Sequence, residues 1–276
     1  MAHGIRPGWA RAGLARSLAI ANLVGLGALL GLVAGPMAAA AGPVTRTLDV
    51  YDSRAALYQD PDKLACTSAA AQMMLNVVAY EATAEYFAPP DGLAALPVPR
   101  WRPDTSHETT EAMLAYERSN MTMLAASAGS DPHGWRNALN YFGWGSIKAG
   151  AYEDAAYPSF DAAARAVVVA LAQSRRPVGI LARDGGHAQL VTGFAVSGGD
   201  PRAGGEFTIL GVYVTDPLQS AAMRDAFVTL DTWRSGAATI RFAPYLQNDS
   251  PFRDAIDGQA GTAEWYGKWV IIEPRL

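Results

Sequence analysis

Cysteine and histidine are scarce in this sequence: its 276 residues include one cysteine and four histidines, and only 17% are charged. A single cysteine excludes an internal disulfide. No group of histidines, cysteines and carboxylates has the spacing of a zinc site, so we expect neither a metal nor another cofactor. The net charge of -4 argues against a basic nucleic-acid-binding surface. Half of the residues are hydrophobic, which suits a globular domain with a sizeable core.

The N-terminus has the pattern of a secretory signal. Three arginines precede an apolar stretch from Leu18 to about Val33, and residues 37–41 supply the small side chains that a signal peptidase accepts. We expect residues 1–41 to be removed and the protein to be secreted or extracytoplasmic. The alternative is an uncleaved membrane anchor at residues 18–41, which are numerous enough to span a bilayer.

Residues 42–276 predict one domain of the α+β class, with helices in its first half and antiparallel strands in its second. The capping-box pattern Thr105-x-x-Glu108 predicts one helix start. Helices are expected at 66–86, 105–126, 131–142 and 160–174, and strands at 44–50, 178–182, 187–196, 207–215 and 269–272. The glycine-rich run 197–205 is expected to form the tip of a hairpin and not a phosphate loop, because no helix follows it.

Cys66 follows a turn at 58–62 and begins a helix in this reading. The free N–H groups and the dipole at a helix N-terminus stabilise a thiolate, so this is a favourable place for a nucleophile. A free thiol outside the cell is open to oxidation and needs a reason to be there. The plainer reason is that Cys66 is a small buried hydrophobic residue.

A cysteine nucleophile needs a base, and His107, His133 and His187 remain once the signal is removed. His187 is the best placed, because it follows the turn Asp184-Gly185-Gly186 and opens an apolar strand. His107 is expected to be solvated. His133 lies in Asp131-Pro132-His133-Gly134-Trp135, a stretch for which we favour a structural role over a place in a substrate cleft.

Three short segments together resemble the papain-like cysteine peptidases, and most closely the branch that includes the bacterial double-glycine leader peptidases. They are Cys66-Thr67-Ser68-Ala69-Ala70, Gly186-His187-Ala188 leading to Gly193-Phe194, and Val214-Thr215-Asp216-Pro217. The resemblance implies a papain-like fold, with the nucleophile at the start of a helix and the other catalytic groups on the sheet.

The same resemblance implies a role for each matching residue. Cys66 would be the nucleophile, His187 the general base and later acid, and Asp216 the group that orients the imidazole. Gln59 would help to hold the oxyanion, although it lies seven positions before Cys66 and Thr67 replaces the family's usual glycine. The activity implied is hydrolysis of a peptide or cell-wall peptide through a thioester.

Two alternatives stay open at this stage. The papain-like fold could serve as an inactive module that binds peptide or cell-wall glycan. Cell-wall endopeptidases of the Cys-His-His type share the chain order but normally carry Asp-Cys before the helix, where this chain has Ala65-Cys66. The sequence does not identify the substrate.

The sequence also predicts a strand register. If Val196 opposes Phe207 across the hairpin, His187 lies directly opposite Asp216, and Val191 lies opposite Val212. A slip of one residue would send Asp216 to the other face of the sheet, so this register is a sharp test of the triad.

Overall fold

The computed structural model describes residues 44–57, 64–81, 101–122, 129–143, 152–218, 223–247 and 264–275. The chain divides into two units, Met1–Ala41 and Gly42–Leu276, and all described residues belong to the second. The predicted signal segment and Gln59 lie outside the described residues. In the ranges just given, no helix has both the length and the apolar character needed to cross a membrane.

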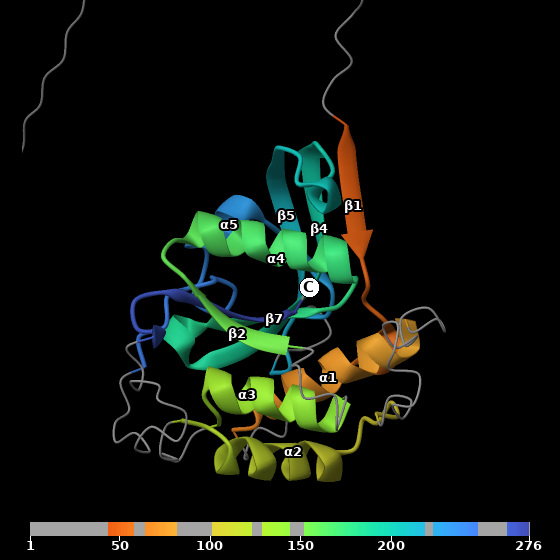
Figure 1. Ribbon diagram of the computed structural model, residues 1–276, viewed down its shortest axis with the longest axis vertical. Coiled ribbons are helices and arrows are strands. Elements are labelled where there is room, and N and C mark those ends of the chain that lie inside the picture. The colour runs from red at the N-terminus through yellow and green to blue at the C-terminus, as the bar shows by residue number, and fades with distance from the viewer. Residues whose placement is uncertain are drawn as a thin grey trace, which may run out of the picture. The chain divides into compact units, whose positions relative to one another are not determined.

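The helices lie mainly in the first half of the unit (Figure 1). The α-helices are α1 (Cys66–Glu81), α2 (His107–Ser119), α3 (Pro132–Ala138), α4 (Phe160–Ser174) and α5 (Leu230–Ser235). A π-helical turn, Leu139–Gly143, continues α3, and short 3-10 turns lie at Ser53–Ala55, Arg183–Gly185 and Pro201–Ala203.

The strands form one antiparallel sheet. They are β1 (Thr45–Asp49), β2 (Tyr152–Tyr157), β3 (Val178–Ala182), β4 (His187–Gly198), β5 (Phe207–Thr215), β6 (Ala226–Thr229) and β7 (Trp269–Pro274). Within the described residues the order is β2-β7-β3-β4-β5-β6. β4 is long enough to pair with β3 through residues 187–191 and with β1 through residues 193–197. The predicted α+β class is confirmed.

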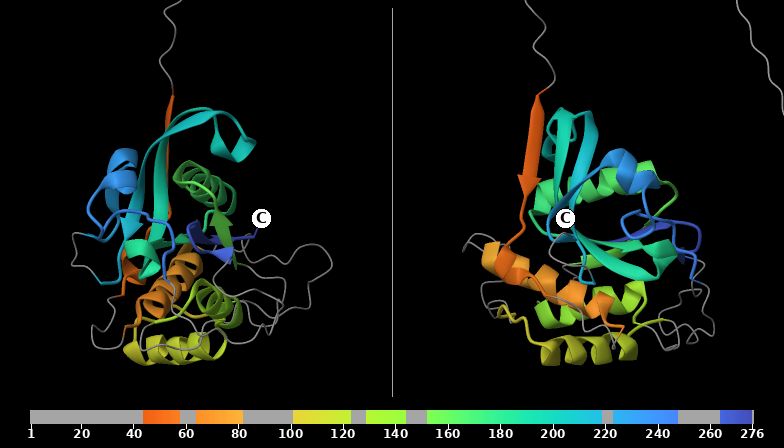
Figure 2. Two further views of the ribbon diagram at one scale, coloured as in Figure 1. Left: turned by 90° about the vertical axis from the view of Figure 1, so that its left-hand side faces the viewer. Right: turned by 180° about the vertical axis from the view of Figure 1, so that it is seen from behind.

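The central strands are buried on both faces, so their side chains alternate between two cores. One core gathers Ile180, Val191 and Ile271 beneath α4, and the other gathers Leu181, Leu190 and Ile272 beneath α1 and α3. Figure 2 shows α1, α2 and α3 grouped together at one side of the sheet, away from α4. The start of α1 is thereby packed next to the start of β4.

The prediction for α4 is confirmed at both ends. Ser159 accepts a hydrogen bond from the N–H of Ala162 as the N-cap, and Arg175 ends the helix in the left-handed conformation. The predicted start of α2 is wrong by one position, because the capping side chain is that of Ser106, which accepts from the N–H of Thr109. α2 also ends early, at Ser119, since Asn120 serves as its C-cap.

The predicted register between β4 and β5 is wrong by two residues at both ends of the ladder and by three residues at Gly193–Ala195. Val196 pairs with Ile209 and not with Phe207, and Val191 pairs with Val214 and not with Val212. The ladder contains two irregularities, at Val191/Gly193 and at Ala195/Val196, which the sequence pattern does not reveal. At the end of the ladder nearest His187 the shift is two, which keeps side chains on their expected face, so the predicted face of Asp216 is retained.

Replacing Gly193 with alanine should detach β1 from the sheet. A Cβ at this position would lie 2.4 Å from the carbonyl oxygen of Leu48 and 2.9 Å from the Cα of Asp49. We expect a loss of about 1–3 kcal/mol in the free energy of unfolding in urea, with faster amide hydrogen exchange in β1. Gly204→Ala is the control: a Cβ there has nothing within 4 Å, so its strain is confined to a turn with φ of 70°, and exchange in β1 should stay unchanged. Normal exchange in the Gly193 variant would refute the steric argument.

Candidate active site

Cys66 is the first residue of α1 and is half-buried. Ala65, which precedes it, has no side-chain oxygen to cap the helix, and its carbonyl accepts from the N–H of Ala69 and the hydroxyl of Ser68. The first N–H groups of the helix therefore lie around the cysteine, where they favour an anion. The position predicted for Cys66 is confirmed.

His187 is fixed by the hairpin that joins β3 to β4. It pairs with Ala182, and the turn between them passes through Arg183, Asp184 and Gly185 with φ angles of 51°, 56° and 90°. A side chain at Gly185 would collide with the ring of Tyr245, 2.5 Å away, so glycine is required there. The carbonyl of Asp184 accepts from the N–H of Leu246, which holds this unusual turn in place. His187 thus has little freedom to move.

His187 and Asp216 are in contact, but His187 is not directly opposite Asp216 as predicted. The register of β4 and β5, continued one residue past its last pair, places Gln189 opposite Asp216 instead. Nε2 of His187 lies 2.8 Å from Oδ1 of Asp216, and both side chains are almost fully buried. Cys66 lies close enough to His187 to raise the pKa of the imidazole. Because Asp216 occupies Nε2, the nitrogen left to face the thiol is Nδ1. The sheet and α1 therefore bring together a thiol, an imidazole and a carboxylate.

Gln189 is a member of this cluster that sequence reasoning missed. Its Nε2 donates to Oδ2 of Asp216 at 2.8 Å and to the carbonyl of Thr239 at 2.7 Å. The signal was present, because residues two apart on a strand share a face and Gln189 is two positions after His187. The N–H of Leu218 adds a further bond to Oδ1 at 2.7 Å, so both oxygens of Asp216 are held.

These contacts shift two pKa values in opposite directions. Burial lowers the pKa of His187, but its interactions with Asp216 and Cys66 outweigh burial and raise it to about 9. Burial raises the pKa of Asp216, yet its bonds to His187, Gln189 and Leu218 leave the pKa below its ordinary value. At neutral pH the pair is an imidazolium and a carboxylate.

The remaining histidines lie elsewhere. His107 is exposed, as expected. His133 is buried beside Arg136, and its Nδ1 lies 3.9 Å from Asp154. Asp131 caps α3 by accepting from the N–H of Gly134, and Trp135 is fully buried. The cap and the burial of the stretch 131–135 agree with the structural role that the sequence favoured.

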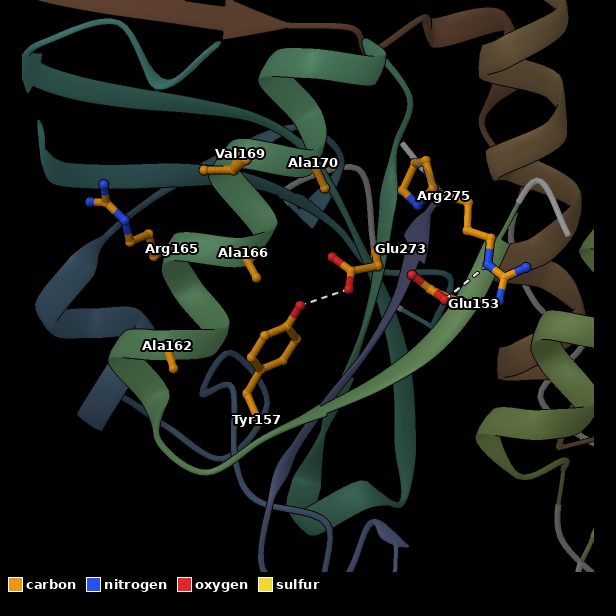
Figure 3. A pocket seen from close by; sticks show the side chains of 10 residues that line it. Glu153, Tyr157, Ala162, Arg165, Ala166, Val169, Ala170, Glu273 and Arg275 are labelled. Atoms are coloured by element: carbon orange, nitrogen blue, oxygen red, sulfur yellow. Dashed lines mark hydrogen bonds and ion pairs between the residues drawn. The ribbon is translucent and has the colours of Figure 1, made fainter. Parts of the chain in front are cut away.

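A separate pocket of about 700 Å³ lies between α4 and the strands β2 and β7, and no candidate catalytic residue lines it (Figure 3). Its polar side chains are already paired. Tyr157 donates to Glu273 at 2.7 Å, and Arg275 donates to Glu153 at 3.0 Å. Burial raises the pKa of Glu273. None of the residues that line this pocket could take part in a reaction at the Cys66 thiol.

No protein-family model, curated protein or solved structure matches this chain. Among the described residues, no group of three or more histidines, cysteines or carboxylates is arranged to hold a metal ion. The assignment of a function therefore depends on the geometry of the site.

Proposed function

We propose that this protein is a papain-like cysteine hydrolase that cleaves peptide or cell-wall peptide amide bonds. One observation carries the proposal: a thiol at a helix N-terminus lies beside a histidine whose Nε2 is held by a buried carboxylate. This is the arrangement that converts a weak nucleophile into a strong one. A buried structural cysteine needs neither partner.

The chemistry divides between the three groups. The Cys66 thiolate attacks the carbonyl carbon of the substrate, and the resulting tetrahedral anion collapses to a thioester as His187 gives its proton to the departing amine. His187, now neutral, takes a proton from water, which attacks the thioester. The acid leaves, the sulfur regains its electron pair, and His187 holds the proton again. Asp216 keeps the imidazole oriented and favours its charged form throughout.

The substrate-independent test of this proposal is the alkylation of Cys66 by iodoacetamide at pH 6. An ordinary thiol with a pKa near ~8.5 is ionised there to only about 0.3%, whereas a thiol that an imidazolium activates is expected to react as the thiolate. Since a less basic thiolate is also a poorer nucleophile, we expect alkylation at least about tenfold faster than that of a free cysteine peptide.

His187→Gln is the matched variant for this experiment, because it removes the charge of the imidazolium and should return the rate to that of an ordinary thiol. Slow alkylation of the wild-type protein at pH 6 would contradict the hydrolase proposal. It would favour a papain-like module that binds peptide or glycan without catalysis.

A further inference from the structure

A buried carboxyl group lies next to the candidate nucleophile and has no place in the mechanism above. Glu117 on α2 is completely buried, and its Oε2 accepts a hydrogen bond of 2.6 Å from the hydroxyl of Thr67. Thr67 is the residue after Cys66 and is itself 2% exposed. Glu117 therefore contacts the first turn of the helix that presents the thiol.

The surroundings of Glu117 are those of an uncharged acid. Its Oε1 is buried and accepts no hydrogen bond from any residue that the structure describes, which is costly for an ionised carboxylate. The charged or ionisable groups that face it are Cys66 on α1, Asp131 before α3 and Arg118 on α2. Burial raises the pKa of Glu117 most, the bond from Thr67 lowers it, the negative charges of Cys66 and Asp131 raise it, and the result is about 8.

We propose that Glu117 is a positioning residue of the Cys66 site and that it works in its protonated form. Through Thr67 it fixes the first turn of α1, which has no capping side chain at Ala65. Because protonated Glu117 is neutral, Cys66 is the group that carries the negative charge at this helix end. This inference rests on the proposed function, since it concerns the reactivity of the same thiol.

The proposal has a reciprocal consequence. If the thiolate disfavours ionisation of Glu117, an ionised Glu117 must disfavour the thiolate by the same free energy. It must also repel an anion that approaches the sulfur. The reactivity of Cys66 toward a negatively charged reagent should therefore fall as Glu117 ionises near pH 8, before His187 loses its proton near pH 9.

Iodoacetate is the probe, because it alkylates the thiolate and carries a negative charge. In the wild-type protein the second-order rate of alkylation between pH 5 and 10 should fall with a midpoint near 8. In Glu117→Gln, which keeps the shape and an acceptor for Thr67 but cannot ionise, the midpoint should move to about 9, the pKa of His187. Below pH 7 the two proteins should react alike.

A second variant keeps the test decisive if Glu117→Gln does not fold. Thr67→Val removes the donor that lowers the pKa of Glu117, so it should also shift the midpoint upward. The control is Glu108→Gln, which removes an exposed carboxylate from the same helix and should leave the midpoint near 8.

The outcomes separate this inference from the proposed function. Rapid alkylation at pH 6 with the same midpoint in the wild-type protein and in the variants at 117 or 67 would overturn the role of Glu117 and leave the hydrolase proposal standing. Slow alkylation of the wild-type protein at pH 6 would overturn the hydrolase proposal itself.

Discussion

Cys66→Ala is expected to abolish hydrolysis of any peptide substrate and all incorporation of iodoacetamide. The chain has no other cysteine, so no second thiol can substitute for it. Removing the nucleophile of such a site leaves only what binding and the remaining hydrogen bonds provide, a loss of several orders of magnitude in kcat/KM.

The same variant should keep its fold. Cys66 is half-buried at a helix end, so we expect the free energy of unfolding to change by less than roughly 1–2 kcal/mol. Urea unfolding of the two proteins measures this difference. Full activity in the alanine variant would end the cysteine-hydrolase reading, whereas loss of activity together with unfolding would need Cys66→Ser as a closer replacement.

The second large effect is expected at Asp216. Asp216→Ala should lower kcat/KM by about 100-fold or more, because the imidazole loses the partner that sets its tautomer and its charge. Without the carboxylate, the pKa of His187 should fall from about 9 toward its ordinary value near ~6.5. The alkaline limb of the pH profile of kcat/KM should move in the same direction.

Asp216→Asn should lose less activity, since it keeps one acceptor for the N–H of His187. Its amide nitrogen, however, meets the Nε2 donor of Gln189, so some loss is expected. Asp231→Asn on the exposed face of α5 is the control and should change neither kcat/KM nor the pH profile. An alanine variant as active as the wild-type protein would reduce the triad to a Cys-His dyad.

Asp216 is also expected to couple stability to pH through His187. The imidazolium is more stable in the folded state, where the pKa of His187 is about 9, than in the unfolded chain, where it is near ~6.5. The stabilisation is complete below the unfolded value and is lost as the pH rises from about 6.5 to 9. The slope of unfolding free energy over this window should be smaller in Asp216→Ala.

Local signals in the sequence were enough to predict the helices and strands whose ends are marked by capping or turn residues next to them. The cap at Ser159 and Pro177 after the last turn bound α4, and apolar runs with β-branched residues between turn residues indicate β3, β4 and β5. β2 was missed because its residues Glu153 and Asp154 have low strand propensity, and its partner β7 lies far along the chain.

In the candidate site, too, contacts between residues far apart in the sequence were harder to predict than local features. The contact between His187 and Asp216 was predicted, although through a register that is wrong by two residues. Glu117 was not predicted, but it lies in the buried stripe of α2 together with Thr110, Met113 and Leu114. An acid at a core position of an amphipathic helix is a signal that periodicity alone could have given. Its partner, Thr67, requires the tertiary structure.

The pairing of β1 with β4 has a consequence for how the protein folds. Thr45 pairs with Ser197 about 150 positions later in the chain, and Cys66 is about 120 positions before His187, so these contacts have a high contact order. Until the second half of the chain has packed against the first, the thiol of Cys66 lacks His187 and Asp216, the groups that set its reactivity. Oxidants that reach the chain in that interval would convert Cys66 to a sulfenic acid or link it by a disulfide to another molecule, because the chain has no second cysteine. The reducing power of the refolding buffer should therefore determine how much protein regains a reactive Cys66.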